Sequence, residues 1–165
     1  TSYSEYTGDL DKWYTEHVNR EFVAKRNQMS RLLQEENDLM EIVKLVGADV
    51  LPEEQKLILE VCRVIRIGFL QQNAHHAVDT YVPPEKQFYM MDAMLHLYDR
   101  SLDAVKMGIP VSVIRELGYF EECISMKYTV SNEDFTPIAE MKTKFDAGLR
   151  ALQKEYAEHE RRGVQ

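Results

Sequence analysis

Two histidine-containing pairs are the side chains in this sequence that most resemble ligands or catalysts. His75 and His76 are adjacent, and Asp92 and His96 lie four residues apart, which places them on one face of a helix. Adjacent histidines point in different directions, and a di-iron bundle needs Glu-x-x-His on each of two helices, a pattern that does not occur here. We therefore expect no metal site, with His96 an ordinary partly buried or surface histidine.

The cysteines and the classical nucleotide motifs also give no catalytic centre. Cys62 and Cys123 are far apart and form no Cys-x-x-Cys, which argues against a disulfide framework or a zinc knuckle and favours a reducing, cytoplasmic setting. The sequence contains no Gly-x-x-x-x-Gly-Lys-Ser/Thr phosphate loop and no Gly-x-Ser-x-Gly nucleophile elbow. We expect no catalytic residue within this sequence.

Length and charge restrict the class of protein. The chain has 165 residues and a net charge of −8, which argues against nucleic-acid binding and against non-specific attachment to an anionic membrane. Hydrophobic residues make up 44% and charged residues 29%, a globular composition. No run of about 18 apolar residues is present, so we expect no direct membrane insertion.

The elements that would position any site are helices. A helix is predicted over 22–46, ended by Gly47, and a second over 52–72, begun by Pro52 and weakened locally by Gly68. The first has an apolar stripe at steps of three and four residues, formed by Phe22, Met29, Leu32, Leu33, Leu39, Met40, Val43 and Val46.

The rest of the chain continues the helical pattern. Residues 73–82 break the period and are predicted to form a connector, and 83–160 hold the remaining helices, with 125–131 expected as an extended link. Residues 1–20 form a lead-in with one short helix from Asp9 to about His17. The sequence predicts an all-α single domain, a bundle of five to six helices.

One stretch resembles a known family. Phe69-Leu-Gln-Gln-Asn-Ala74, the segment Pro83-Pro-Glu-Lys-Gln87 and the segment Glu41-Ile-Val-Lys-Leu-Val-Gly47 closely resemble the C-terminal helical domain of the catalytic A subunit of archaeal and vacuolar-type rotary ATPases. The resemblance covers essentially the whole chain. It implies that residues 1–165 are the C-terminal helical domain of a larger catalytic subunit, whose phosphate loop and catalytic residues lie in another part.

The resemblance implies a role for the 73–82 connector at the adenine. In that family an aromatic ring there stacks on the base, and the positions here are Asn73, Ala74, His75 and Tyr81. His75 stands where the family commonly has Phe or Tyr, so it faces the base in one interpretation and solvent in the other. The full subunit would bind ATP or ADP with Mg, and we expect neither to bind this fragment tightly.

The resemblance also implies a mechanical role for the turn between the first two helices. Residues Gly47, Ala48, Asp49, Val50, Leu51, Pro52, Glu53 and Glu54 occupy the place where related subunits press on the central stalk. The implied partners are B subunits in an alternating hexamer, the stalk subunits and the nucleotide-binding domain of the same polypeptide. The implied activity is an ATP synthase or ATPase coupled to proton or sodium transport, cytoplasmic and peripheral to the membrane in the soluble head.

A second interpretation comes from a different class of protein. The same helical pattern suits a stand-alone protein-interaction module with no nucleotide role. A domain that docks on a neighbouring domain of the same polypeptide should expose apolar side chains near Trp13 and residues 69–82, whereas a self-contained module should not.

Overall fold

The computed structural model describes residues 21–71 and 81–164, so the short helix expected from Asp9 to His17 lies outside the described residues. Within these ranges the chain forms six α-helices, a 3₁₀-helix and a π-helix, and no strand. They are α2 (Phe22–Val46), η1 (Ala48–Val50), α3 (Glu53–Ile65), η2 (Arg66–Leu70), α4 (Pro84–Lys106), α5 (Val111–Arg115), α6 (Tyr119–Thr129) and α7 (Thr136–Val164). The all-α prediction is confirmed, with a number of helices within the expected range.

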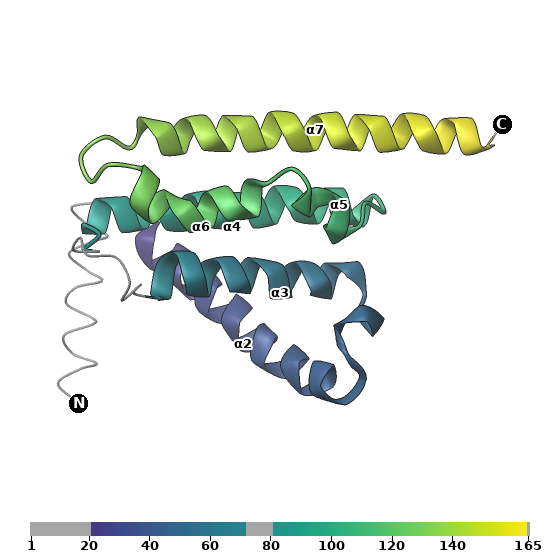
Figure 1. Cartoon of the computed structure of the whole chain (residues 1–165), viewed down its shortest axis with the longest axis horizontal. Helices are drawn as coiled ribbons and strands as arrows, with labels where there is room; N and C mark the ends of the chain where they lie inside the picture. The colour runs from purple at the N-terminus through teal and green to yellow at the C-terminus, as the bar shows by residue number, and fades with distance from the viewer. Residues whose placement is uncertain (1–20, 72–80, 165) are drawn as a thin grey trace.

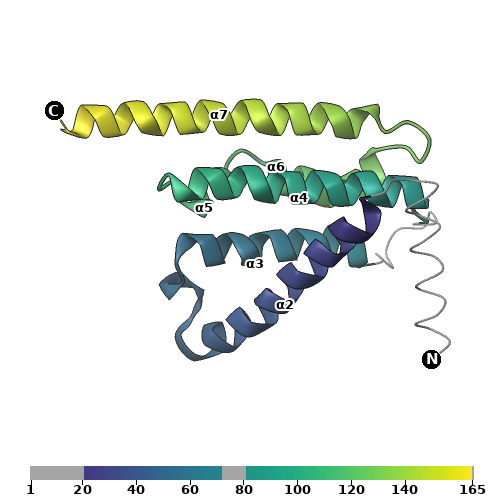
Figure 2. The same ribbon diagram turned by 180° about the vertical axis from the view of Figure 1, so that it is seen from behind.

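The helices are stacked in layers (Figures 1 and 2). The long helix α7 forms one outer layer and packs along α4, which lies beside α6 in the layer below it. Helix α3 packs on α4 and α6, and α2 crosses beneath α3 and diverges from it toward the turn that joins them. The turn after α2 lies at one end of α3, and η2, which precedes the 73–82 segment in sequence, continues from the other end.

The core sits where α3, α4 and α6 meet. Leu57 and Ile65 of α3, Met90 and Met91 of α4, and Cys123 of α6 are fully buried. These side chains recur at helical spacing in the sequence, and their burial stabilises each helix against its neighbours. Helix α3 is therefore held along its length by other elements.

The apolar stripe predicted for 22–46 is buried only in its first part. Phe22, Met29, Leu32 and Leu39 are buried, but Met40 and Val46 are exposed. The physical reason is the divergence of α2 from α3 (Figure 2), which leaves no described element over the end of the stripe. The periodicity predicted the helix correctly and overestimated its buried length.

The extended link expected over 125–131 is wrong, because α6 continues to Thr129. Cys123, Met126 and Val130 are buried at spacings of three and four residues, which is a helical face. The alternation of Met126, Tyr128 and Val130 that suggested an extended chain arises because Tyr128 lies on the exposed side of the helix.

Gly68 lies at the point where the helix that follows the turn changes its hydrogen-bonding pattern. Residues Arg66–Leu70 form the π-helix η2, at the position predicted to be weak. A Cβ at Gly68 would lie 3.0 Å from the Ile124 Cα, 3.0 Å from the Met94 Cε and 3.3 Å from the Cys123 carbonyl oxygen. The glycine therefore permits the close approach of η2 to the α6 backbone.

We expect Gly68→Ala to lower the free energy of unfolding by about 1–3 kcal/mol, because the added methyl overpacks this contact. Urea denaturation measures the change. The matched control is Gly163→Ala, whose Cβ would have nothing within 4 Å and which should be neutral or slightly stabilising. Equal stability of the two variants would contradict the close approach.

Asp92 links three helices by ion pairs. Its carboxylate lies 2.9 Å from Lys25 Nζ of α2 and 2.5 Å from Lys142 Nζ of α7. One turn further along α4, His96 Nε2 lies 2.6 Å from Asp146 Oδ1 of α7. Burial raises the pKa of Asp92, but hydrogen bonds from Lys142 and Lys25 outweigh it and hold the pKa below its ordinary 3.8.

Because the folded pKa of Asp92 is depressed, its stabilising contribution is present above pH 3.8 and is lost as pH falls through the lower folded value. We expect Asp92→Asn to lower the free energy of unfolding at pH 7 by about 1–2 kcal/mol. The difference from the parent chain should shrink toward pH 3 in urea titrations. A difference independent of pH would contradict the ion-pair account.

Candidate functional site

The turn between α2 and α3 is built by a glycine and a short 3₁₀-helix. Gly47 has φ of +84°, and its N–H donates to the Val43 carbonyl at 2.8 Å to close α2. Ala48–Val50 form η1, and Pro52 precedes the first residue of α3. Leu51 is only 7% exposed and anchors the turn to the bundle. The structure thus brings all eight predicted turn residues together, with Leu51 facing inward.

The turn presents exposed apolar side chains, of which only Val50 is among the residues predicted to contact the stalk. Leu45 is 84% exposed, Val46 58% and Val50 62%, and Ile42 is exposed one turn earlier on α2. We call Leu45, Val46 and Val50 the apolar tip. The sequence does give a sign of this surface, because Leu45 is apolar and lies outside the apolar stripe predicted for the same helix.

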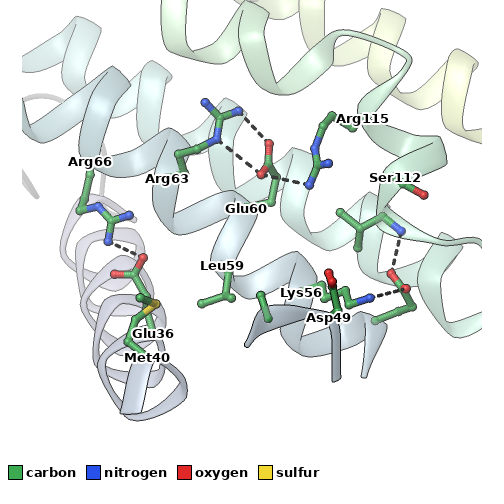
Figure 3. Close-up of a pocket in the computed structure, with 13 residues that line it drawn as sticks. Glu36, Met40, Asp49, Lys56, Leu59, Glu60, Arg63, Arg66, Ser112 and Arg115 are labelled. Carbon is green, nitrogen blue, oxygen red and sulfur yellow. Dashed lines mark hydrogen bonds and ion pairs between the residues drawn. The ribbon is translucent and has the colours of Figure 1, made fainter. Parts of the chain in front are cut away.

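A charged pocket of about 430 Å³ lies between the turn and α5 (Figure 3). Glu53, one of the predicted turn residues, lies in its wall: its Oε2 accepts the Val111 N–H at 2.9 Å, and its Oε1 lies 3.4 Å from Lys56 Nζ. Glu53 therefore joins the start of α3 to the start of α5, which gives this acidic residue an internal structural contact.

Two buried glutamates hold the arginines of the same pocket (Figure 3). Glu60 accepts from Arg63 Nη2 at 2.7 Å and from Arg115 Nη2 at 3.5 Å, and Glu36 of α2 pairs with Arg66 of η2. The hydrogen bond that Arg63 donates to Glu60 raises the pKa of Arg63, so its guanidinium stays charged.

The charges in this pocket balance. Four acidic residues (Glu36, Asp49, Glu53 and Glu60) and four basic ones (Lys56, Arg63, Arg66 and Arg115) line it. Since the arginines are already paired, the arrangement links α2 to η2 and α3 to α5 and is poorly suited to binding an anion.

The opposite end of α3 carries a second pocket, of about 280 Å³, lined by Phe69, Leu70, Tyr81, Val82, Gln87, Met90 and Lys127. Tyr81 is 64% exposed. Among the predicted adenine-side residues only Tyr81 falls within the described part of the chain; Asn73, Ala74 and His75 lie outside it. Two of these described lining residues, Phe69 and Tyr81, are aromatic and three are aliphatic, and such walls beside the polar Gln87 and Lys127 can hold a flat heterocycle.

Exposed apolar side chains lie in the wall of this second pocket and nearby on η2. Ile67, Leu70 and Tyr81 are all exposed at this end of the bundle. The patch expected near residues 69–82 is therefore present, while Trp13 lies outside the described residues.

The described residues contain no cluster of three or more His, Cys, Asp or Glu side chains placed to hold a metal ion. In the same part of the chain no helix is both long and apolar enough to span a membrane. Burial raises the pKa of Cys62 to about 12 and also raises that of Cys123, so both thiols stay protonated at neutral pH.

Comparison with known proteins identifies the family. Residues 11–114 match the family model described as the C-terminal domain of V and A type ATP synthase. Over 156 residues, 94% of this chain, the sequence is 49% identical to V-type ATP synthase alpha chain 2 of Clostridium tetani. It is 44% identical, over 93% of its length, to the A subunit of the A-type ATP synthase of Methanopyrus kandleri. The chain belongs to this family of V- and A-type ATP synthase C-terminal domains.

The length of these relatives and the organisms they come from limit what the match shows. The chain spans about a quarter of their length, 26% of both proteins. They come from bacteria as well as archaea, so the match does not assign the chain to archaea. Membership favours the rotary ATPase interpretation over the stand-alone interaction module.

Proposed function

We propose that this chain is the part of an ATP synthase catalytic subunit that closes the adenine side of the nucleotide pocket and passes displacement to the central stalk. The observation that carries the proposal is the path of α3 and η2. One continuous helical segment, residues 53–70, joins the turn at Gly47–Glu54 to the pocket beside Tyr81.

This segment has the properties of a stiff rod. The 13 residues of α3 alone correspond to about 20 Å at the rise of an α-helix, and the π-helix η2 extends the segment further. It packs on α4 and α6, and interiors packed at this density resist compression. A movement imposed at Phe69 and Tyr81 by closure on a nucleotide would therefore be carried to the apolar tip with little loss.

The chemistry of ATP would belong to the remainder of the catalytic polypeptide. The pocket beside Tyr81 suits the base, and Lys127, the cationic side chain among its described lining residues, already donates to a backbone carbonyl. ATP or ADP with Mg would be held by the nucleotide-binding domain, with B subunits alternating around the ring. The assembly would couple to proton or sodium transport from a soluble head peripheral to the membrane, in the cytoplasm.

The test uses a chimeric head, in which this chain replaces the matching segment of the Clostridium tetani alpha chain and the remaining subunits are those of that organism. Tyr81→Ala in the chimeric head should raise KM for ATP about tenfold, because base stacking on an aromatic ring contributes about 1–3 kcal/mol. Tyr81→Phe keeps the ring and should keep KM. An unchanged KM in Tyr81→Ala would rule out a role of Tyr81 at the base.

A further inference from the structure

Two side chains at and just after the C-terminal end of α6 donate hydrogen bonds to the backbone at Gln71 and at Tyr81, next to the second pocket. Lys127 Nζ donates to the Gln71 carbonyl at 2.7 Å, just after η2. Asn132 Nδ2 donates to the Tyr81 carbonyl at 3.2 Å, just before α4. Gln71 and Tyr81 are ten residues apart in sequence, yet both are contacted from one place, by Lys127 in the last turn of α6 and by Asn132 three residues after that helix ends.

Lys86 of α4 holds this end of α6 in place by hydrogen bonds. Its side chain is 1% exposed, and its Nζ donates to the Lys127 carbonyl at 2.9 Å, the Val130 carbonyl at 2.6 Å and Asn132 Oδ1 at 3.0 Å. An ammonium has three donors, and here each has an acceptor. The contact to Asn132 Oδ1 turns the amide so that its Nδ2 faces the Tyr81 carbonyl.

The arrangement places two buried lysines within one small region. Burial lowers the pKa of Lys86 and of Lys127, which reflects the cost of removing an ammonium from water. Such groups are held where their hydrogen bonds fix a definite geometry. Lys86 binds carbonyls at the end of α6, whereas Lys127 binds the Gln71 carbonyl, next to the pocket walls Phe69 and Leu70.

We propose that Lys127 and Asn132 are positioning residues for the nucleotide base, acting through Gln71 and Tyr81, with Lys86 as their support. This rests on the proposed function of the pocket beside Tyr81. Lys127 sets the end of η2, Asn132 sets the backbone at Tyr81, and together they fix the separation of the two walls. None of the three residues needs to touch the nucleotide.

The sharpest test is Asn132→Asp in the chimeric head. The new carboxylate still accepts from Lys86, so the support remains, but it has no N–H to donate to the Tyr81 carbonyl. We expect KM for ATP to rise about fivefold, the effect of one lost hydrogen bond, with kcat within twofold and the melting temperature unchanged. The preference for ATP over GTP should fall by a similar factor.

Two further variants complete the test. Asn37→Asp makes the same change of charge at an exposed position of α2 and should leave KM unchanged. Lys127→Met should raise KM, and Lys127→Arg, which keeps a donor, should restore most of it. An unchanged KM and base preference in folded Asn132→Asp and Lys127→Met would overturn the proposal.

Comparing these variants with Tyr81→Ala distinguishes a failure of this proposal from a failure of the proposed function. If Tyr81→Ala raises KM while Asn132→Asp and Lys127→Met do not, the pocket binds the base and the positioning role is wrong. If Tyr81→Ala also leaves KM unchanged, the proposed function of the pocket fails, and the positioning role fails with it.

Discussion

Replacing Lys86 by methionine is expected to lower the free energy of unfolding by about 3 kcal/mol. The substitution removes a buried ammonium and so recovers its desolvation cost. It also leaves the Lys127 and Val130 carbonyls without the donor that now lies 2.9 and 2.6 Å away. We expect the loss of these hydrogen bonds to outweigh the recovered desolvation cost, because a buried acceptor without a donor costs about 1–3 kcal/mol and the substitution leaves two of them. Urea denaturation gives the value.

The matched control is Lys106→Met, at the exposed end of the same helix α4. It removes the same kind of side chain without leaving a buried acceptor unpaired, and it should change the free energy of unfolding by less than about 1 kcal/mol. If the two methionine variants unfold at the same urea concentration, the buried lysine does not support the end of α6.

Replacing the apolar tip with serine is expected to uncouple the chimeric head. In the triple variant Leu45→Ser, Val46→Ser and Val50→Ser, we expect ATP hydrolysis to continue while the torque on the stalk falls severalfold or rotation stops. The reason is that exposed apolar groups stabilise a contact by about 25 cal/mol for each Å² that they bury, and serine buries little. Single-molecule rotation under load, measured beside bulk ATP hydrolysis, separates coupling from turnover.

The three substitutions lie at exposed side chains, so the fold should survive them. Met107→Ser, at an exposed apolar residue just after α4, is the control and should leave both torque and hydrolysis unchanged. Full torque in the triple variant would show that the apolar tip is not the surface that moves the stalk.

The sequence predicted the helices well where apolar residues repeat and a strong terminator follows. Helix 22–46 ends at Gly47 as expected, because the positive φ there suits glycine. The weak point at Gly68 was also predicted, since glycine interrupts the helical pattern. These features depend on residues close together in the chain, and a single sequence contains that information.

The features that the sequence did not predict depend on residues far apart in the chain. Lys127 contacts Gln71 across 56 positions, and Lys86 contacts Val130 across 44. A lysine in an ordinary polar pattern gives no sign that it will be buried. The exposure of Val46 was missed for a similar reason, because the divergence of α2 from α3 is a tertiary feature that no local periodicity encodes.

Proximity of the turn to the stalk tests the central claim most directly. A single cysteine introduced as Val50→Cys in the chimeric head can carry a photoreactive maleimide; the chain's own thiols are buried and protonated, so they should not compete. We predict cross-linking to a protein of the central stalk, with a yield that changes when ADP replaces a non-hydrolysable ATP analogue. Cross-links only to neighbouring head subunits, with either nucleotide, would contradict the account.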